Sequence, residues 1–187
     1  MKRIILTAIL ALCAFAASAQ TLVVYYSRSG QNYTSDGIVN LKKGNTQVFA
    51  EKIQSLMGAD IFRLETVREY SADYMTCTQE AKDELNTKAR PALRADIDIS
   101  KYDTIYLGWP CWWGTMPMCV FTFLEAHDWT GKTVIPFTTH EGSGWGSGLR
   151  DLKAALPKAT IGKGLAIQGS KVSTSMSQIE KFTTGGK

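Results

Sequence analysis

Apolar runs of strand length alternate with segments of helical periodicity, and this alternation restricts the folds that are open to the chain. The strand-like runs are Thr21–Ser27, Asp60–Glu65, Thr104–Trp109, Thr133–Thr138 and Gly162–Ile167. The first, third and fourth runs are almost continuously apolar, which is typical of parallel strands that are covered on both faces. We therefore expect a three-layer α/β/α domain with a five-stranded parallel sheet and right-handed crossovers.

Helix-like segments lie between these runs. Thr46–Leu56 has apolar residues at helical spacing, with Asn45 as the expected N-cap and Gly58 as the expected stop. The other expected helices are Met116–Ala126, Gly148–Leu156 and the shorter Ser175–Phe182. Ala72–Lys88 is more polar, and we expect it to form a surface helix that covers one edge of the sheet.

The first nineteen residues have the features of a secretory signal peptide. Lys2 and Arg3 form a positive start, Ile4–Ala17 is apolar, and Ala17-Ser18-Ala19 is a small-residue cleavage signal. The apolar run is short for a membrane span, which disfavours the alternative of an uncleaved anchor. We therefore expect a signal peptide over residues 1–19, one domain over residues 20–187, and a periplasmic or extracellular product without a stable membrane anchor.

Charge and cysteine content exclude several classes of protein. The full chain has a net charge of +4 and no Lys/Arg cluster, so nucleic acid is not an expected partner. Outside the signal peptide lie Cys77, Cys111 and Cys119, which allow at most one disulfide within the chain and leave open whether Cys111 pairs with Cys119. Without a CxxC motif, and with two histidines in all, no zinc site is expected.

Three loops that follow predicted strands have unusual compositions, and ligands of open parallel sheets bind at this end of the strands. The first loop is Ser27-Arg28-Ser29-Gly30, which continues at Gly44-Asn45-Thr46 after an apparent insertion. Hydroxyl groups, backbone N–H groups and a helix N-terminus can bind a phosphate without a lysine. The alternative is an ordinary polar turn. We expect the insertion to leave the two ends of the loop close together and to cover the flank of the anion site.

The second loop runs from Trp109 to Pro117 and the third from Thr139 to Gly148. Trp112 and Trp113 in the second loop suit stacking on a flat aromatic ligand, and we expect one of them to cap the sheet while the other faces the ligand. The third loop has four glycines that let the backbone approach a ligand closely, and Trp145 adds another flat surface. A flexible Gly/Ser loop is the alternative for the third loop.

The motifs "YYSRSG…GNT", "GWPCWWGTMPMCVFTFLE" and "PFTTHEGSGWG" together resemble those of the flavodoxin-like family, from Thr21 to nearly the end of the chain. The resemblance implies a strand order of 2-1-3-4-5 and FMN as the cofactor. It implies that the first loop holds the FMN phosphate and that the other two loops flank the isoalloxazine ring. The candidate cofactor-binding residues are Ser27, Arg28, Ser29, Gly30, Asn32, Asn45, Thr46, Pro110, Cys111, Trp112, Trp113, Gly114, Thr115, Met116, Thr139, His140, Glu141, Gly142, Ser143, Gly144 and Trp145.

Two functions compete on this basis. The first is an FMN-dependent oxidoreductase that passes electrons from a reduced donor to a small acceptor such as a quinone, and the second is an electron carrier or flavin-binding module that acts with a redox partner protein. Low-potential carriers of the family are acidic, whereas the chain after the signal peptide has 19 basic and 17 acidic residues. In the two ring-flanking loops Glu141 is the one acid, so we favour the oxidoreductase. His140 and Cys111 are candidates for proton or redox chemistry beside the ring, and the oligomeric state, a homodimer included, is left open.

Overall fold

The computed structural model describes residues 20–185, and the expected signal peptide lies outside them. The elements are β1 (Gln20–Tyr26), β2 (Gly30–Thr34), β3 (Gly37–Leu41), α1 (Asn45–Met57), β4 (Asp60–Leu64), α2 (Tyr74–Thr87), β5 (Tyr102–Pro110), α3 (Met118–Ala126), β6 (Thr133–His140), α4 (Gly148–Ala155), β7 (Thr160–Ile161), β8 (Leu165–Gln168), the 3₁₀ helix η1 (Gly169–Thr174) and α5 (Met176–Thr184). No helix in this part of the chain is long and apolar enough to cross a membrane.

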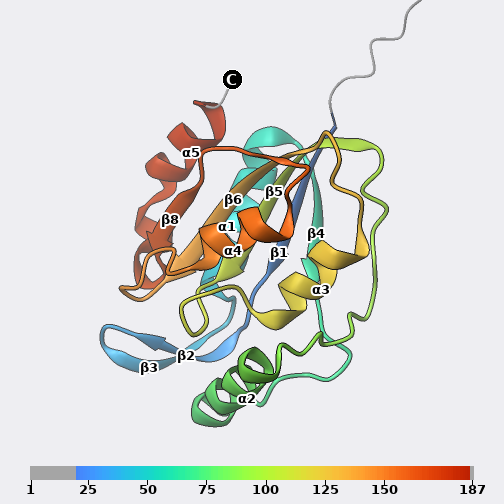
Figure 1. Ribbon diagram of the computed structural model, residues 1–187. Coiled ribbons are helices and arrows are strands. Elements are labelled where there is room, and N and C mark those ends of the chain that lie inside the picture. Colours follow the sequence, from blue (N-terminus) through green and yellow to red (C-terminus); the bar gives the residue numbers. More distant parts are fainter. Residues whose placement is uncertain (1–19, 186–187) are drawn as a thin grey trace, which may run out of the picture.

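A parallel sheet forms the centre of the domain, with the strand order β4-β1-β5-β6-β7 and β8 also paired with β6 (Figure 1). Because β7 and β8 share one side of β6, they act as two halves of a fifth strand. Counted along the chain within this sheet, the order is 2-1-3-4-5. The predicted three-layer fold and strand order are therefore confirmed.

Strand β1 shows why the sheet needs helices on both faces. Its side chains alternate between two hydrophobic clusters, as the period of two in a strand requires. Leu22, Val24 and Tyr26 join the cluster that contains Phe123 of α3 and Leu152 of α4. Val23 and Tyr25 join the second cluster, which contains Phe49 and Ile53 of α1 and Ile179 of α5. A strand that is buried on both faces reads as a continuous apolar run, and this explains why the sequence located it well.

The fifth strand differs from its predicted bounds of Gly162–Ile167. Residues 162–164 separate β7 from β8 and lie opposite the two residues Ile135 and Pro136 of β6. Pro136 has no N–H group to donate to a neighbouring strand, so the ladder is interrupted there. A Cβ on Gly164 would lie 2.7 Å from the carbonyl oxygen of Pro136, which shows how closely the two chain segments approach at the break.

The bounds of α1 confirm one prediction and correct another. Gly58 ends the helix in the left-handed conformation, with φ of 61°, as expected for a C-terminal glycine. The N-cap is Gly44 and not Asn45, which is the first helical residue. Ser27 Oγ accepts the N–H of Gln47 in place of a cap side chain, and position 44 has room for glycine alone, because a Cβ there would overlap Ser27 Oγ and the carbonyl oxygen of Arg28.

The polarity of α2 suggested that it would cover one edge of the sheet, but it does not. It lies near the carboxyl ends of the strands, beside the β2–β3 hairpin (Figure 1). The N–H group of Tyr74 donates to Gln31 Oε1 at 2.8 Å, and the indole N–H of Trp113 donates to the carbonyl oxygen of Thr78 at 2.9 Å. These bonds join α2 to the loops that the sequence marked as functional.

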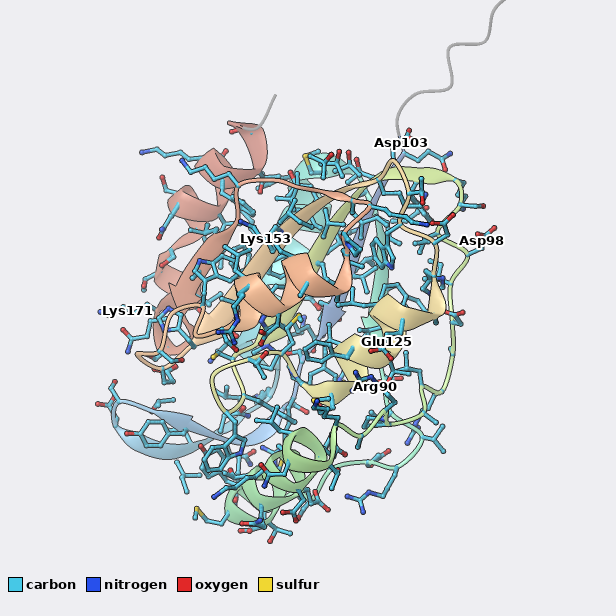
Figure 2. All side chains as sticks on the ribbon, viewed as in Figure 1. Arg90, Asp98, Asp103, Glu125, Lys153 and Lys171 are labelled. Atoms are coloured by element: carbon cyan, nitrogen blue, oxygen red, sulfur yellow. The ribbon has the colours of Figure 1, made fainter. Side chains whose placement is uncertain are left out.

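The chain that leaves α2 is attached to α3 by a bidentate ion pair. Figure 2 shows Arg90 and Glu125 side by side, and two Arg90 nitrogens donate to the two Glu125 carboxylate oxygens at 2.8 and 2.6 Å. The hydrogen bonding raises the pKa of Arg90 and lowers the pKa of Glu125. This attachment helps to hold α2 at the site end of the sheet.

Candidate functional site

The N-terminus of α1 forms one end of the site. Ser27 follows β1 and is buried, and its Oγ accepts the N–H of Gln47 at 3.1 Å, which is the bond that an N-cap side chain normally accepts. Among the hydrogen bonds of residues 20–185, the N–H groups of Asn45 and Thr46 have no acceptor. Two helix N–H groups therefore remain for an anion, and the positive end of the helix dipole favours one.

The insertion in this loop is the two-stranded β2–β3 hairpin, with all five residue pairs from Gly30–Leu41 to Thr34–Gly37 in register. The two ends of the first loop, on either side of this hairpin, meet where Gly44 packs against Ser27 and Arg28, as the sequence predicted. The Arg28 guanidinium donates to the carbonyl oxygens of Gln31, Ser71 and Ala72. Arg28 thus connects the hairpin to the segment before α2, and its guanidinium N–H groups donate to backbone carbonyl oxygens.

The second loop follows β5 and is tied to the third. The N–H of Cys111 donates to the carbonyl oxygen of Thr139 at 2.8 Å, while Trp112 and Thr115 exchange two backbone hydrogen bonds. Trp112 packs edge-on against Tyr26 and Tyr70, with ring centroids 5.4 and 5.1 Å away. Its indole is therefore held at a defined angle beside the carboxyl end of β1.

The third loop follows β6, and its acid is bonded to the end of β8 and the start of η1. Glu141 accepts hydrogen bonds from the N–H and hydroxyl groups of Ser170, at 2.7 and 3.1 Å, and from Gln168. The N–H of Gly142 donates to His140 Nδ1 at 3.0 Å, which in a neutral ring leaves the proton on Nε2. Burial lowers the pKa of His140, and the Glu141 carboxylate opposes this effect. His140 is accordingly neutral near pH 7.

A carboxylate network joins the second and third loops behind the site. Asp151 of α4 accepts the hydroxyl groups of Thr115 at 2.7 Å and Ser147 at 2.5 Å. The N–H of Ser147 also donates to the carbonyl oxygen of Gly114 at 2.6 Å. Gly146 has φ of 51° and lies against Gly114 so closely that a Cβ would overlap its carbonyl oxygen. Glycine is required at 146 for both reasons.

A cleft opens where the three loops meet, and twelve of the sequence-predicted residues line it. It is lined by Ser27, Arg28, Asn32, Tyr33, Asn45, Thr46, Tyr74, Pro110, Cys111, Trp112, Thr139, His140, Glu141, Ser143 and Gly169. The buried hydroxyls of Thr46 and Thr139 lie 2.7 Å apart and connect α1 to β6 across its floor. The lining of the cleft thus combines the first residues of α1 with the indole of Trp112.

Nine predicted site residues lie outside this cleft. Ser29 and Gly30 line a neighbouring cleft beside β4, and Gly114, Gly142 and Gly144 line neither. Thr115 and Met116 of the second loop are buried, and Trp145 packs against Trp109, so the side chains of these three do not line the cleft and their roles in cofactor binding stay predictions. Composition alone does not show which side of a loop faces the ligand.

The two neighbouring tryptophans also differ from expectation. Trp112 both packs on the end of β1 and lines the cleft, so one residue fills the two roles that we divided between the pair. Trp113 lies outside the cleft, against α2, and its side chain is 48% exposed. Its backbone has φ of 50°, and a bulky residue rarely adopts this conformation.

Three cleft residues were missed from the sequence. Tyr33 is on β2 and Tyr74 on α2, with their rings stacked at a centroid distance of 6.4 Å, and Gly169 begins η1. A Cβ on Gly169 would lie 2.5 Å from Asn45 Nδ2, so this glycine permits the close approach of η1 to α1. Tyr33 and Tyr74 lie in segments that the sequence marked as insertion and surface helix, and only their aromatic character was a signal.

The three cysteines of the described chain are free thiols. Cys111 lines the cleft, whereas Cys77 and Cys119 are buried. Burial raises the pKa of Cys77 to about 11 and also raises the pKa of Cys119. These two thiols are therefore protonated at neutral pH and poor nucleophiles.

Comparisons with known proteins agree with this architecture. A candidate flavoprotein from Bacteroides uniformis ATCC 8492 is 28% identical with a TM-score of 0.68, covering 87% of this chain and 99% of its own. One from Bacteroides eggerthii DSM 20697 is 27% identical with a TM-score of 0.66, covering 86% and 98%. The flavoprotein from Lactobacillus acidophilus NCFM, solved in complex with FMN, shares the fold at 21% identity and a TM-score of 0.61, covering 84% and 98%.

No curated protein matches the chain. A family model described as Flavodoxin matches residues 20–182, which include every element from β1 to most of α5. This chain therefore belongs to the flavodoxin family.

Proposed function

We propose that the cleft binds FMN, with the phosphate at the N-terminus of α1 and the isoalloxazine ring beside Trp112. The observation that carries this proposal is the pair of N–H groups on Asn45 and Thr46, which have no acceptor among residues 20–185, in a cleft that the indole of Trp112 also lines. Backbone N–H groups at a helix N-terminus suit a phosphate, and an indole suits a flat ring. The flavoprotein of Lactobacillus acidophilus, which has the same fold, was solved with FMN.

The surrounding residues prepare the cleft for this ligand. Ser27 occupies the N–H of Gln47, so the remaining two N–H groups form a defined anion site. Glu141 is held by Ser170 and Gln168, which keeps its negative charge bonded to η1. Trp112 is fixed by Tyr26 and Tyr70, so little side-chain entropy is lost when a ring stacks on it.

We propose further that the protein is an oxidoreductase that passes electrons to a small acceptor such as a quinone. FMN supplies the electron chemistry, and the protein binds it, orients it and shields it. The near-balanced charge of residues 20–187 supports this choice over an electron carrier, because a carrier of low potential gains from negative surroundings of its flavin. The neutral His140 in the cleft provides an Nε2–H that can donate a hydrogen bond.

A rapid-mixing experiment separates the two functions. FMN-loaded protein is reduced with dithionite without oxygen and is then mixed with either a soluble quinone or oxidised cytochrome c. We expect reoxidation by the quinone to saturate with its concentration and to be faster than reoxidation by the protein acceptor. Two results together would instead support the carrier: reoxidation by cytochrome c faster than by the quinone, and a rate of reoxidation by the quinone that rises linearly with its concentration without saturating.

The site of action is also a proposal. The positive start, the apolar run and Ala17-Ser18-Ala19 support removal of residues 1–19 and export. N-terminal sequencing of protein purified from the native host should show a chain that starts at Gln20. A chain that starts at Met1 in a soluble cytosolic fraction would contradict export.

A further inference from the structure

A second cavity lies next to the proposed FMN cleft, between α2 and the second loop. Its volume is about 270 Å³, and it shares Arg28, Asn32, Tyr74, Cys111 and Trp112 with the cleft. Its remaining walls are Cys77, Thr78 and Ala81 of α2 and Trp113 of the second loop. A molecule in this cavity would lie beside Trp112, the side chain that we assign to the ring of FMN.

Small side chains on α2 create the space. Residues 74, 77, 78 and 81 follow the i, i+3, i+4, i+7 spacing of one helix face, so they point together toward the second loop. Cys77 and Ala81 are buried, yet neither is large enough to fill the gap between α2 and the indoles. A helix that served only to cover the domain would present leucine or isoleucine there.

Trp113 forms the outer wall of the cavity in a constrained conformation. It is half exposed, its backbone has φ of 50°, and its indole N–H is fixed to Thr78 on α2. Lys82 Nζ lies 4.9 Å from the centre of the indole ring. Strained residues of this kind are found at ligand clamps, and an indole held outside the core is a surface for stacking.

The chemistry of the walls defines the ligand. Among the described residues that line the cavity, Arg28 is the one with a formal charge, and its guanidinium is bonded to three carbonyl oxygens. The amide nitrogen of Asn32 donates to the carbonyl oxygens of Arg28 and Gly30. Tyr74 Oη takes part in none of the hydrogen bonds of residues 20–185, so it is free to donate one to a ligand.

We infer that this α2 cavity binds an uncharged, flat aromatic molecule of one or two rings with a carbonyl oxygen, the chemistry of a quinone. The volume lies just below the range of about 300–1,000 Å³ for drug-sized ligands, which fits a small ring system. Trp112 and Trp113 supply stacking surfaces, and the Tyr74 hydroxyl is the donor for the carbonyl. The inference rests on the proposed function in naming the acceptor site, but the binding itself does not require FMN.

The test is equilibrium dialysis of apoprotein and FMN-loaded protein against 2,3-dimethyl-1,4-naphthoquinone, whose methyl groups block the addition of thiols such as Cys111. We expect one probe to bind per chain with or without FMN. Ala81→Leu fills the cavity and should weaken the probe at least about tenfold while FMN binding stays unchanged. Ala72→Leu, the same substitution at an exposed position before α2, should leave the probe affinity unchanged.

Trp113→Ala provides an independent variant, since removal of a half-exposed side chain leaves the core intact if Ala81→Leu does not fold. Loss of one stacking surface should weaken the probe about 2- to 13-fold. Equal affinity of Ala81→Leu and wild type, no effect of Trp113→Ala, or no binding at all would overturn the inference. Displacement of the probe by FMN would also overturn it, because the cavity would then be part of the FMN site. If the probe binds and FMN does not, the proposed function fails and the cavity assignment stands.

Discussion

Gly44 connects the two ends of the split first loop, and replacement by alanine tests whether this junction holds the anion site. Its φ of −66° and ψ of 149° suit alanine, so the backbone conformation adds no cost. A Cβ there would lie 2.8 Å from the carbonyl carbon of Arg28 and would overlap its oxygen and Ser27 Oγ. A rotamer change cannot relieve a clash with backbone, so the loop has to move.

The expected cost follows from these contacts. Overpacking of this kind costs about 1–3 kcal/mol, and loss of the bond from Gln47 N–H to Ser27 Oγ adds about 0.5–1.5 kcal/mol. If the shift also removes one hydrogen bond to the FMN phosphate, a further 1.5–3 kcal/mol of binding is lost, which corresponds to an affinity roughly 10- to 150-fold weaker. Urea unfolding measures the first effect, and quenching of flavin fluorescence measures the second.

Gly37→Ala is the matched control. Gly37 has φ of 104° in the turn of the hairpin, with open space around its Cβ position, so alanine there strains the backbone without touching the loop. It should lower the stability and leave FMN affinity within about twofold of wild type. If Gly44→Ala lowers the stability but binds FMN as the control does, the role assigned to this junction is wrong.

Three further substitutions test other parts of the site. Trp112→Ala should weaken FMN and riboflavin alike, by about one to three decades, because it removes stacking and burial at the ring end, and an effect on FMN alone would contradict the assignment. Asp151→Ala should lower the unfolding free energy by about 1.5–3 kcal/mol, measured in urea. Burial would raise the pKa of Asp151, but hydrogen bonds from Ser147 and Thr115 lower it, so this stabilisation is present above about pH 4 and is lost as the pH falls further. The variant should show a smaller loss of stability in that acid range, and an unchanged pH profile would count against the network. His140→Gln should flatten the pH dependence of stability below about pH 6.5, because the lowered pKa of His140 stabilises the fold above that pH and this contribution is lost on acidification. A His140→Gln profile that matches wild type between pH 7 and 5 would show that burial of this ring does not affect folding.

The sequence predicted the sheet well because its central strands are buried on both faces. Runs such as Thr104–Trp109 have few alternatives to a parallel strand once helices alternate with them. The fifth strand was harder, because the break at residues 162–164 depends on Pro136 in the neighbouring strand. A contact between strands that are distant in sequence is invisible to local periodicity.

The site was predicted in part for a similar reason. Ser27 and Trp112 closely follow central strands, and Thr46 lies in the first turn of α1, so the topology places them at the carboxyl edge of the sheet. Tyr33 and Tyr74 reach the cleft only because the hairpin and α2 fold back over that edge, held by Arg28. Trp145 has the residue type of a ligand-stacking side chain but packs on Trp109.

The most direct test of the account is calorimetric titration of apoprotein with FMN and, in parallel, with riboflavin, which has the ring but no phosphate. The N–H groups of Asn45 and Thr46 predict one FMN per chain, bound at least about tenfold more tightly than riboflavin, since one hydrogen bond to a charged group contributes about 1.5–3 kcal/mol. Equal affinity for the two ligands, or no binding of FMN at micromolar protein, would contradict the assignment of the N-terminus of α1 as the phosphate site.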